Sequence, residues 1–266
     1  MSKLSKTKIE EYLPNLQNTE IYVFDTIDST NSEAKRRINE GFISDGIFVA
    51  EHQTEGRGRR GKSFFSPANS GLYFTALLHP NTSIEDTVGI TAATAVVVTE
   101  VLERITKKHP KIKWVNDIFI DNKKVCGILT EMYMEGTKIS SIIVGTGINV
   151  NQDNFPEDIS DIATSLKIES GKMQSRENLV KRINELFEIF FEMFVKSKDL
   201  SGILEEYNSR LISKGRKVKV LDPKEEFVGE ALGINIHGEL LVKKESGEVG
   251  NVYAGEVSVR GIYGYV

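Results

Sequence analysis

The segment from Ile84 to Thr106 constrains the fold most strongly. It is rich in alanine and valine, and its apolar residues cover more than one face of the helix that their spacing predicts. Such a helix must be covered on several sides, so we expect it to pack centrally against a sheet. Strand-like runs that could supply this sheet occur at residues 20–25, 46–51, 72–78, 111–120, 124–131 and 138–144.

Further helices are predicted on both sides of these strands. Ser29, Thr30 and Asn31 are all favourable N-cap types, and they precede a helix over residues 32–40 with Gly41 at its C′ position. A short helical turn at residues 9–13 is stopped by Pro14. Residues 121–122 read as a hairpin turn and 153–165 as irregular, and helices are expected at 176–195 and 200–211.

The pattern changes near residue 215. Short strands at 217–221, 227–234, 239–243 and 255–260 alternate with turns, which indicates a small all-β domain of the size of an SH3-like barrel. We therefore predict an α+β fold with a main domain over residues 1–213 and a C-terminal β domain over residues 214–266.

Composition excludes several classes of protein. The formal net charge is −4, which argues against bulk electrostatic binding to nucleic acid. The single cysteine, Cys126, cannot form an intramolecular disulfide, fits a cytoplasmic location, and is better explained as a small buried hydrophobe than as a nucleophile. No apolar run approaches the roughly 20 residues that a membrane span needs. The four histidines have no spacing that suggests a metal site or a catalytic triad.

The segment Gly56–Lys62 combines glycines with closely spaced arginines and a lysine. Glycine allows a close backbone approach to a ligand, and arginine matches phosphate and carboxylate oxygens. Because clustered cations repel one another, we expect a loop that orders on an anionic, phosphate-bearing ligand. A solvated basic turn or an Arg-Gly contact with RNA is the alternative.

Other polar stretches lie at the ends of predicted strands, where ligands collect on a rigid scaffold. Each has a structural alternative. Ser29, Thr30 and Asn31 could simply cap a helix, Lys124 could be a turn lysine, and residues 145–147 could be a bulge. Asn116 and Asp117 interrupt an otherwise apolar strand, which favours a functional role.

These stretches occur together in a characteristic order. Ser29-Thr30-Asn31 is followed by Gly56 to Gly61, Lys113-Trp114-x-Asn116-Asp117, Lys124-x-x-Gly127, Gly145-x-Gly147-Ile148-Asn149 and Ala254-Gly255-Glu256-x-Ser258-x-Arg260. Over residues 20–266 the chain resembles the biotin protein ligases (biotin–[acetyl-CoA-carboxylase] ligases), in the short form without an N-terminal DNA-binding domain. The resemblance implies a mixed sheet flanked by helices, with an SH3-like C-terminal domain.

The resemblance also implies an activity. Ligases of this family form biotinyl-5′-adenylate from biotin and ATP with Mg²⁺, and then transfer biotin to a lysine of a biotin carboxyl carrier protein. It assigns catalysis to Arg57, Arg59, Lys124 and Asp117, with Asp117 also holding the metal. It assigns biotin binding to Ser29, Thr30, Asn31, Gln53, Gly56, Arg57, Gly58, Arg59, Lys124, Gly127 and Gly145. It assigns ATP or adenylate binding to Arg59, Lys62, Phe64, Asn116, Lys124 and Asn149.

Three positions depart from the family pattern: the one at Val115 removes no ligand group, and the other two concern nucleotide affinity. Val115 stands where proline is usual, Lys62 where arginine is usual, and Phe64 where tryptophan is common. Lys62 loses bidentate binding, and Phe64 can stack on adenine but donates no hydrogen bond. A lipoate or octanoate ligase is the nearest alternative enzyme, and an RNA-binding module is the alternative from another class. We expect no DNA or membrane partner, and a homodimer is compatible with the family.

Overall fold

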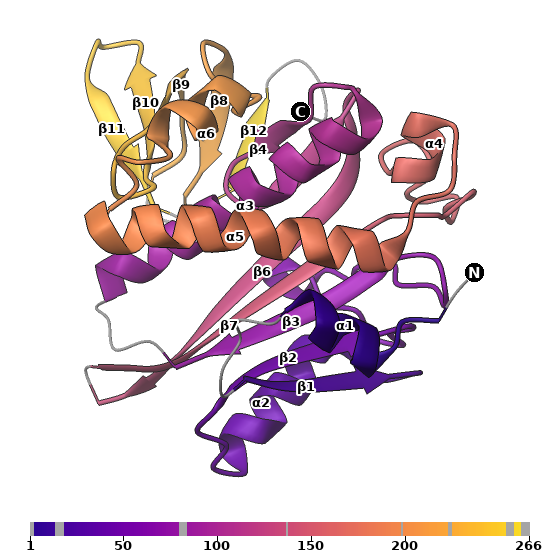
Figure 1. The fold of residues 1–266 in the computed structure, drawn as a ribbon. Coiled ribbons are helices and arrows are strands. Elements are labelled where there is room, and N and C mark those ends of the chain that lie inside the picture. Colours follow the sequence, from indigo (N-terminus) through magenta and orange to yellow (C-terminus); the bar gives the residue numbers. More distant parts are fainter. Residues whose placement is uncertain are drawn as a thin grey trace.

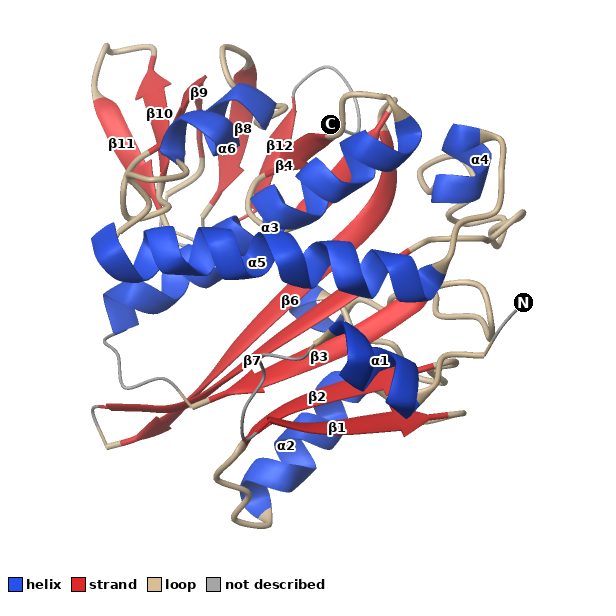
Figure 2. Cartoon of the chain, in the orientation of Figure 1, coloured by secondary structure: helices blue, strands red, loops and turns tan. Residues whose placement is uncertain are grey.

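The computed structural model describes residues 3–13, 19–79, 84–136, 138–197, 199–222, 225–253 and 258–261. Its larger sheet has seven strands in the order β1-β2-β3-β7-β6-β5-β4. β1 and β2 are parallel and all other neighbours are antiparallel, so the sheet is mixed (Figures 1 and 2). The strands are β1 (Thr19–Phe24), β2 (Asp45–Ala50), β3 (Leu72–Leu78), β4 (Lys111–Lys113), β5 (Asp117–Ile120), β6 (Lys123–Glu135) and β7 (Lys138–Ile148).

Helices cover both faces of this sheet. The long helix α3 lies centrally and packs against β6, β7 and α5, as its apolar sequence predicts. On the opposite face, Ala34 of α2 packs with Phe48, Leu77 and Ile143 in a separate apolar cluster. The helices are α1 (Lys6–Tyr12), α2 (Thr30–Asn39), α3 (Ile84–Thr106), α4 (Leu166–Ser170), α5 (Arg176–Ser197) and α6 (Leu204–Arg210), with a short 3-10 turn at Arg59–Gly61.

The second sheet is antiparallel and has five strands in the order β11-β10-β9-β8-β12. Its strands are β8 (Lys217–Leu221), β9 (Phe227–Ile234), β10 (Leu240–Lys244), β11 (Val249–Val252) and β12 (Ser258–Gly261). This arrangement, together with the mixed sheet, confirms the predicted α+β fold. Residues 255–257 of the last predicted strand lie outside the described residues.

Several predicted elements differ from those observed. The strand expected over residues 111–120 is divided into β4 and β5 by a turn, in which the Asn116 N–H donates to the Lys113 carbonyl (3.2 Å) and the Trp114–Val115 peptide bond is cis. The helix expected from Leu200 begins only at Leu204: residues 199–203 form bends and turns, and the Leu200 N–H donates to the Ile236 carbonyl in the connection between β9 and β10 (3.0 Å). The short elements α4 and β11 were not predicted.

Two other expectations are confirmed. Cys126 is completely buried in the core, where burial raises the pKa of its thiol, as suits a hydrophobic residue. Gly41 follows α2 with a φ of +84°, the conformation that favours glycine after a helix. No helix in the described part of the chain is long and apolar enough to cross a membrane.

Candidate active site

A cavity of about 1070 Å³ opens beside the N-terminus of α2 and over β6 and β7. The sequence motifs, far apart in the chain, meet in its wall. Of the residues assigned to the site from the sequence, only Gly56 lies outside the lining. The others are Ser29, Thr30, Asn31, Gln53, Arg57, Gly58, Arg59, Lys62, Phe64, Asn116, Asp117, Lys124, Gly127, Gly145 and Asn149.

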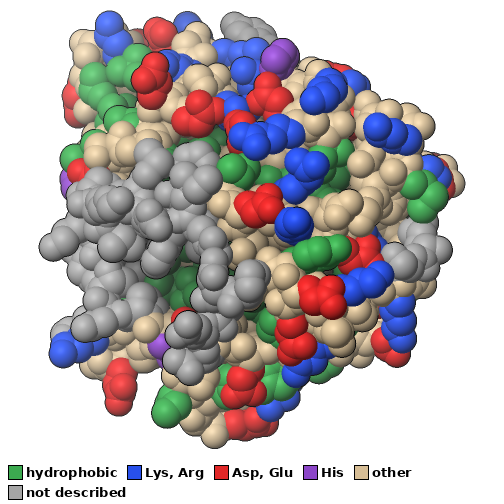
Figure 3. Space-filling model, in the orientation of Figure 1, with side chains coloured by type: hydrophobic (Ala, Val, Ile, Leu, Met, Phe, Trp, Pro, Cys, Tyr) green, Lys and Arg blue, Asp and Glu red, His purple; other side chains and the backbone are tan. Residues whose placement is uncertain are grey.

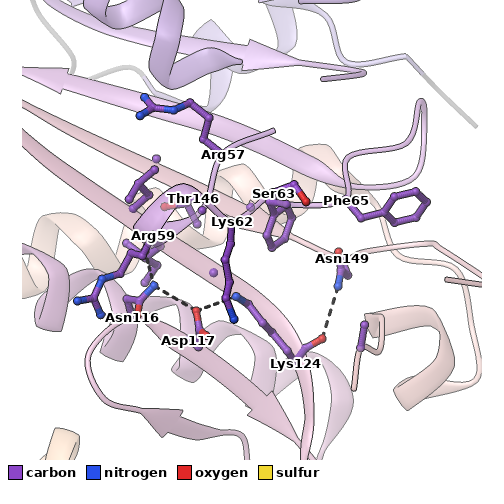
Figure 4. A pocket seen from close by; sticks show the side chains of 18 of the residues that line it. Arg57, Arg59, Lys62, Ser63, Phe65, Asn116, Asp117, Lys124, Thr146 and Asn149 are labelled. Carbon is purple, nitrogen blue, oxygen red and sulfur yellow. Dashed lines mark hydrogen bonds and ion pairs between the residues drawn. The ribbon is translucent and has the colours of Figure 1, made fainter. Parts of the chain in front are cut away.

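Cationic side chains gather at one end of the cavity (Figure 4). Lys124 Nζ lies 2.8 Å from Asp117 Oδ1, and Asn116 donates to the same carboxylate oxygen (3.1 Å). Arg59 donates to Asn116 Oδ1 (3.2 Å), and Lys62 points toward the same group. The turn between β4 and β5 positions Asn116, whose Nδ2 also donates to the Ile128 carbonyl (2.8 Å). The turn that interrupts the predicted strand therefore brings Asn116 and Asp117 close to the basic loop.

Burial affects the charges at this end. It lowers the pKa of the Arg59 guanidinium, an effect that Asp117 opposes, and it lowers the pKa of Lys113 in the same way. An arginine guanidinium is not deprotonated in proteins, so Arg59 is a cation that is partly removed from water. Such a cation interacts more strongly with an anionic ligand than one in bulk water does.

The other end of the cavity carries neutral polar groups. Ser29 is the N-cap of α2, yet its side chain makes no capping hydrogen bond. Gln53 Oε1 accepts from the Thr30 N–H (2.8 Å), and Gln53 Nε2 donates to Ser66 (3.0 Å). The Thr75 hydroxyl lies 2.7 Å from Asn31 Oδ1. Helix capping alone therefore does not explain Ser29, Thr30 and Asn31, because Ser29 makes no capping hydrogen bond and all three line the cavity.

Glycines form the floor between the two ends. A Cβ added at Gly145 would lie 2.0 Å from Asn31 Oδ1, and one at Gly147 would lie 2.6 Å from the Phe64 ring. A Cβ at Gly127 would lie 3.1 Å from Lys124 Nζ. These positions admit no side chain unless the ligand-facing residues move.

The structure refines the placement of other predicted residues. Gly56 is buried, and a Cβ there would lie 2.4 Å from the Phe64 carbonyl oxygen, so it allows the loop to pack rather than facing the cavity. Asn149 lines the cavity, but its Nδ2 donates to the Thr164 carbonyl (3.0 Å) and its Oδ1 accepts from Gln152 (3.3 Å). The Phe64 ring lies on the glycine floor, with Lys124 Nζ at 5.7 Å from its centroid.

An apolar wall was missed by the sequence reasoning. Phe65 and Phe155 pack edge to face with their ring centroids 6.2 Å apart, and Ile159, Ile162 and Ala163 continue the wall. The sequence pattern of residues 153–165 predicts only irregular structure and gives no sign of this wall. Lys113 and Arg260 also line the cavity although neither was assigned to the site. Residues 254–256 of the closing motif lie outside the described residues.

The donor set for a metal is small. Among the residues whose placement is described, no cluster of three or more His, Cys, Asp or Glu side chains could hold an ion. Asp117 and the amide oxygen of Asn116 are the oxygen donors at the cationic end. That set fits Mg²⁺, which commonly uses one or two carboxylates together with substrate phosphates.

Comparisons with known proteins agree with this geometry. Residues 23–149 match the biotin/lipoate A/B protein ligase family, and residues 215–260 match the biotin protein ligase C-terminal domain. The bifunctional ligase/repressor BirA of Bacillus spizizenii is 32% identical over 97% of this chain and 79% of its own length. The biotin–[acetyl-CoA-carboxylase] ligase of Mycobacterium tuberculosis is 26% identical over 80% of this chain and 79% of its own.

A solved structure supports the same assignment. The biotin protein ligase of Aquifex aeolicus in complex with biotin and ATP superposes with a TM-score of 0.77 and 31% identity, covering 91% of this chain and 99% of that one. The fold, the cavity and these similarities lead to one conclusion: this chain belongs to the biotin protein ligase family.

Proposed function

We propose that this protein joins biotin and ATP into biotinyl-5′-AMP and transfers the biotin to a lysine of a biotin carboxyl carrier protein. The observation that carries the proposal is the division of one cavity into a neutral polar end and a cationic end across a glycine floor. A ligand with an uncharged hydrogen-bonding head and a carboxylate tail, bound beside a nucleotide, matches this division.

Each end fits one part of the substrates. Ser29, Thr30, Asn31 and Gln53 would bind the ureido ring, whose edge carries donors and an acceptor. Arg57, Arg59, Lys62 and Lys124 would surround the biotin carboxylate and the ATP phosphates. We assign the adenine ring to the apolar wall of Phe65 and Phe155 rather than to Phe64, because Phe64 lies on the floor.

The first step brings two anions together. A biotin carboxylate oxygen attacks the α-phosphorus, and the bond from that phosphorus to the pyrophosphate oxygen breaks. Lys124 and Arg59 stabilise the negative charge that develops on the phosphoryl oxygens. Mg²⁺, held by Asp117 with the phosphates, would supply further charge neutralisation.

In the second step the neutral amine of the carrier lysine attacks the biotinyl carbonyl and AMP leaves. Asp117, the carboxylate at the cationic end, is our candidate to accept the proton. We further propose that residues 1–213 form the catalytic unit and residues 214–266 the C-terminal domain, and that the protein acts in the cytoplasm, where its single cysteine remains reduced.

ATP–pyrophosphate exchange tests the first step. We expect exchange with Mg²⁺ and biotin but not with lipoate or octanoate. Lys124→Gln should lower kcat by about 10²–10³, the loss typical for one donor to a developing oxyanion. Lys123→Gln is the matched control, because the adjacent Lys123 lies outside this cavity and donates to Ser160 instead.

The alternatives give different results. Exchange with lipoate or octanoate would place the protein among the sister ligases and overturn the ureido assignment. Absence of exchange with all three acids would contradict adenylate formation. Biotinylation of a purified carrier domain then tests the second step, with a carrier whose target lysine is replaced by arginine as the control.

A further inference from the structure

Glu131 of β6 lies just outside the cavity lining and belongs to none of the motifs that assigned the site. Its carboxylate nevertheless contacts three side chains from two separate segments, the helix α2 and the basic loop. It accepts from Asn31 Nδ2 (3.0 Å), from Lys35 Nζ (2.8 Å) and from Arg57 Nη1 (3.2 Å). These donors come from the first turn of α2, from its middle and from the basic loop.

The contact with Asn31 determines which amide atom faces the ligand. Asn31 Nδ2 is engaged by Glu131 Oε2 and by the Leu129 carbonyl (3.3 Å). The Oδ1 atom consequently accepts from the buried Thr75 hydroxyl (2.7 Å) and lies against the glycine floor at Gly145, which leaves its second lone pair for a ligand. The cavity therefore receives a hydrogen-bond acceptor from this residue, which is what an N–H group of a ureido ring requires.

The contact with Arg57 holds the basic loop in place. Figure 4 shows the Arg57 guanidinium directed away from the group formed by Asn116, Asp117 and Lys124. Its ion pair with Glu131 is partly exposed, with 38% and 20% of the two side chains accessible. A pair of this kind is weak enough to break when a stronger anion arrives.

The carboxylate is held in its charged form. Burial alone would raise the pKa of Glu131, but hydrogen bonds from Lys35 and Asn31 and the nearby charge of Arg57 together lower it. Glu131 is therefore an anion at neutral pH and accepts from all of its neighbours.

We propose that Glu131 is a positioning residue for both parts of the biotin site: it orients the Asn31 amide so that its oxygen meets the ligand, and it holds Arg57 in a waiting position before the ligand binds. The identity of the ligand rests on the proposed function. The restraint of the basic loop by Glu131 does not depend on that function.

Limited trypsin digestion tests the restraint without any substrate. Glu131→Ala and Glu131→Gln both remove the charge that holds Arg57, so cleavage in the loop 57–62 should become about two- to fivefold faster, the range that a partly exposed ion pair supports. Glu135→Ala, at the exposed far end of the same strand, is the control and should leave the rate unchanged. Equal cleavage rates in all four proteins would overturn the loop half of the proposal.

Biotin-dependent exchange tests the orientation of Asn31. Glu131→Ala should raise the KM for biotin about 10- to 100-fold, as expected for a misdirected buried hydrogen bond, with little change in kcat or in the KM for ATP. Glu131→Gln retains an acceptor for Asn31 and should restore most of the biotin affinity while its loop stays sensitive to trypsin. If Glu131 were only structural, its variants would have a smaller active fraction and thus a lower kcat, without a rise in the KM for biotin that Glu131→Gln reverses.

A double-mutant cycle completes the test. If Glu131 acts through Asn31, Glu131→Ala should change the KM for biotin much less in an Asn31→Ala background than in the wild type. Additive effects, or an unchanged KM in the single variant while wild-type exchange is normal, would overturn the orientation half and leave the proposed function intact. A wild type that shows no biotin-dependent exchange would overturn the proposed function and the Asn31 half together, and the trypsin comparison would still decide the role of Glu131 in the loop.

Discussion

Gly145 and Gly147 show how single positions determine the shape of the cavity. Both lie on β7, where alternate residues face the same side of the sheet, and on that side the neighbours are Asn31 and the Phe64 ring. Asn31 and the Phe64 ring can therefore lie against β7 only because these two positions carry no side chain. The bulge interpretation of residues 145–147 is not needed, since β7 pairs in unbroken register with β3 through this region.

Gly147→Ala tests this directly. The new methyl group would lie 2.6 Å from a Phe64 ring carbon, so the ring must leave the floor. We expect the Kd for biotin to rise at least about tenfold, corresponding to overpacking strain of roughly 1–3 kcal/mol, while the protein stays folded. Isothermal titration with biotin and a thermal melt would measure both effects.

Gly250→Ala is the matched control for that substitution. Gly250 lies on β11 and its nearest neighbours would be 3.7 Å from an added Cβ, which is ordinary contact. Biotin binding should be unchanged in this variant. Wild-type affinity in Gly147→Ala would show that the floor tolerates a side chain and that Phe64 is not held against it.

At the scale of elements, the C-terminal end of β2 is held in place by residues that are distant in the sequence. Glu51 follows β2 directly, and its carboxylate forms an ion pair with Arg176 at the start of α5 (2.5 Å), with both side chains 3% exposed. The Leu4 N–H also donates to Glu51. The strand that leads into Gln53 and the basic loop is thus attached to a helix and to the N-terminal segment.

Arg176→Ala should leave the Glu51 carboxylate buried without its ionic partner. Removing one member of a buried pair typically costs about 3–5 kcal/mol in the free energy of unfolding, which urea denaturation would measure. Arg182→Ala, at an exposed position of the same helix, should change it by less than about 0.5 kcal/mol. A similarly small change in Arg176→Ala would mean that water or rearrangement replaces the pair.

The elements also show how far sequence reasoning reaches. Strands and helices with strong apolar periodicity, such as β3 and α3, were predicted because local pattern and tertiary packing agree. The division of 111–120 into β4 and β5 was not, because the turn is stabilised by nonlocal bonds from Asn116 and Trp114. The wall formed by Phe65 and Phe155 was missed for the same reason: the two residues are far apart in the sequence and share no motif.

At the scale of the molecule, charges of both signs mix on the face shown in Figure 3. Figure 3 shows acidic and basic side chains interspersed on the face that it presents, as the net charge of −4 leads one to expect. The cations of the basic loop are therefore a local feature of one cavity. This distribution favours recognition of a small anionic ligand over sequence-independent binding along a nucleic acid.

The C-terminal sheet is attached to the rest of the chain by specific hydrogen bonds. The Trp114 indole donates to the Gly238 carbonyl (3.1 Å). Asn208 of α6 donates to the Ile234 carbonyl (3.1 Å) and accepts from the Ile234 N–H (2.7 Å), so its amide takes the place of a neighbouring strand. On the same sheet β12 contributes Val259 and Arg260 to the cavity, and the charge of Arg260 acts on Lys113. Loss of these hydrogen bonds should therefore disturb the cationic end of the cavity before it disturbs the ureido end.

Asn208→Ala tests this connection between the two domains. It removes both bonds to Ile234, and each unsatisfied backbone group costs about 1–3 kcal/mol, which loosens the C-terminal sheet against α6. We expect the KM for ATP to rise about three- to tenfold in the exchange assay, with the KM for biotin unchanged, because the ureido end is lined only by residues of the larger domain. Asn251→Ala, on the outer strand β11, removes an exposed side-chain bond to Glu239 and should leave both constants unaltered. An equal rise in both KM values would indicate general destabilisation, and an unchanged KM for ATP would show that β12 keeps its place without this attachment.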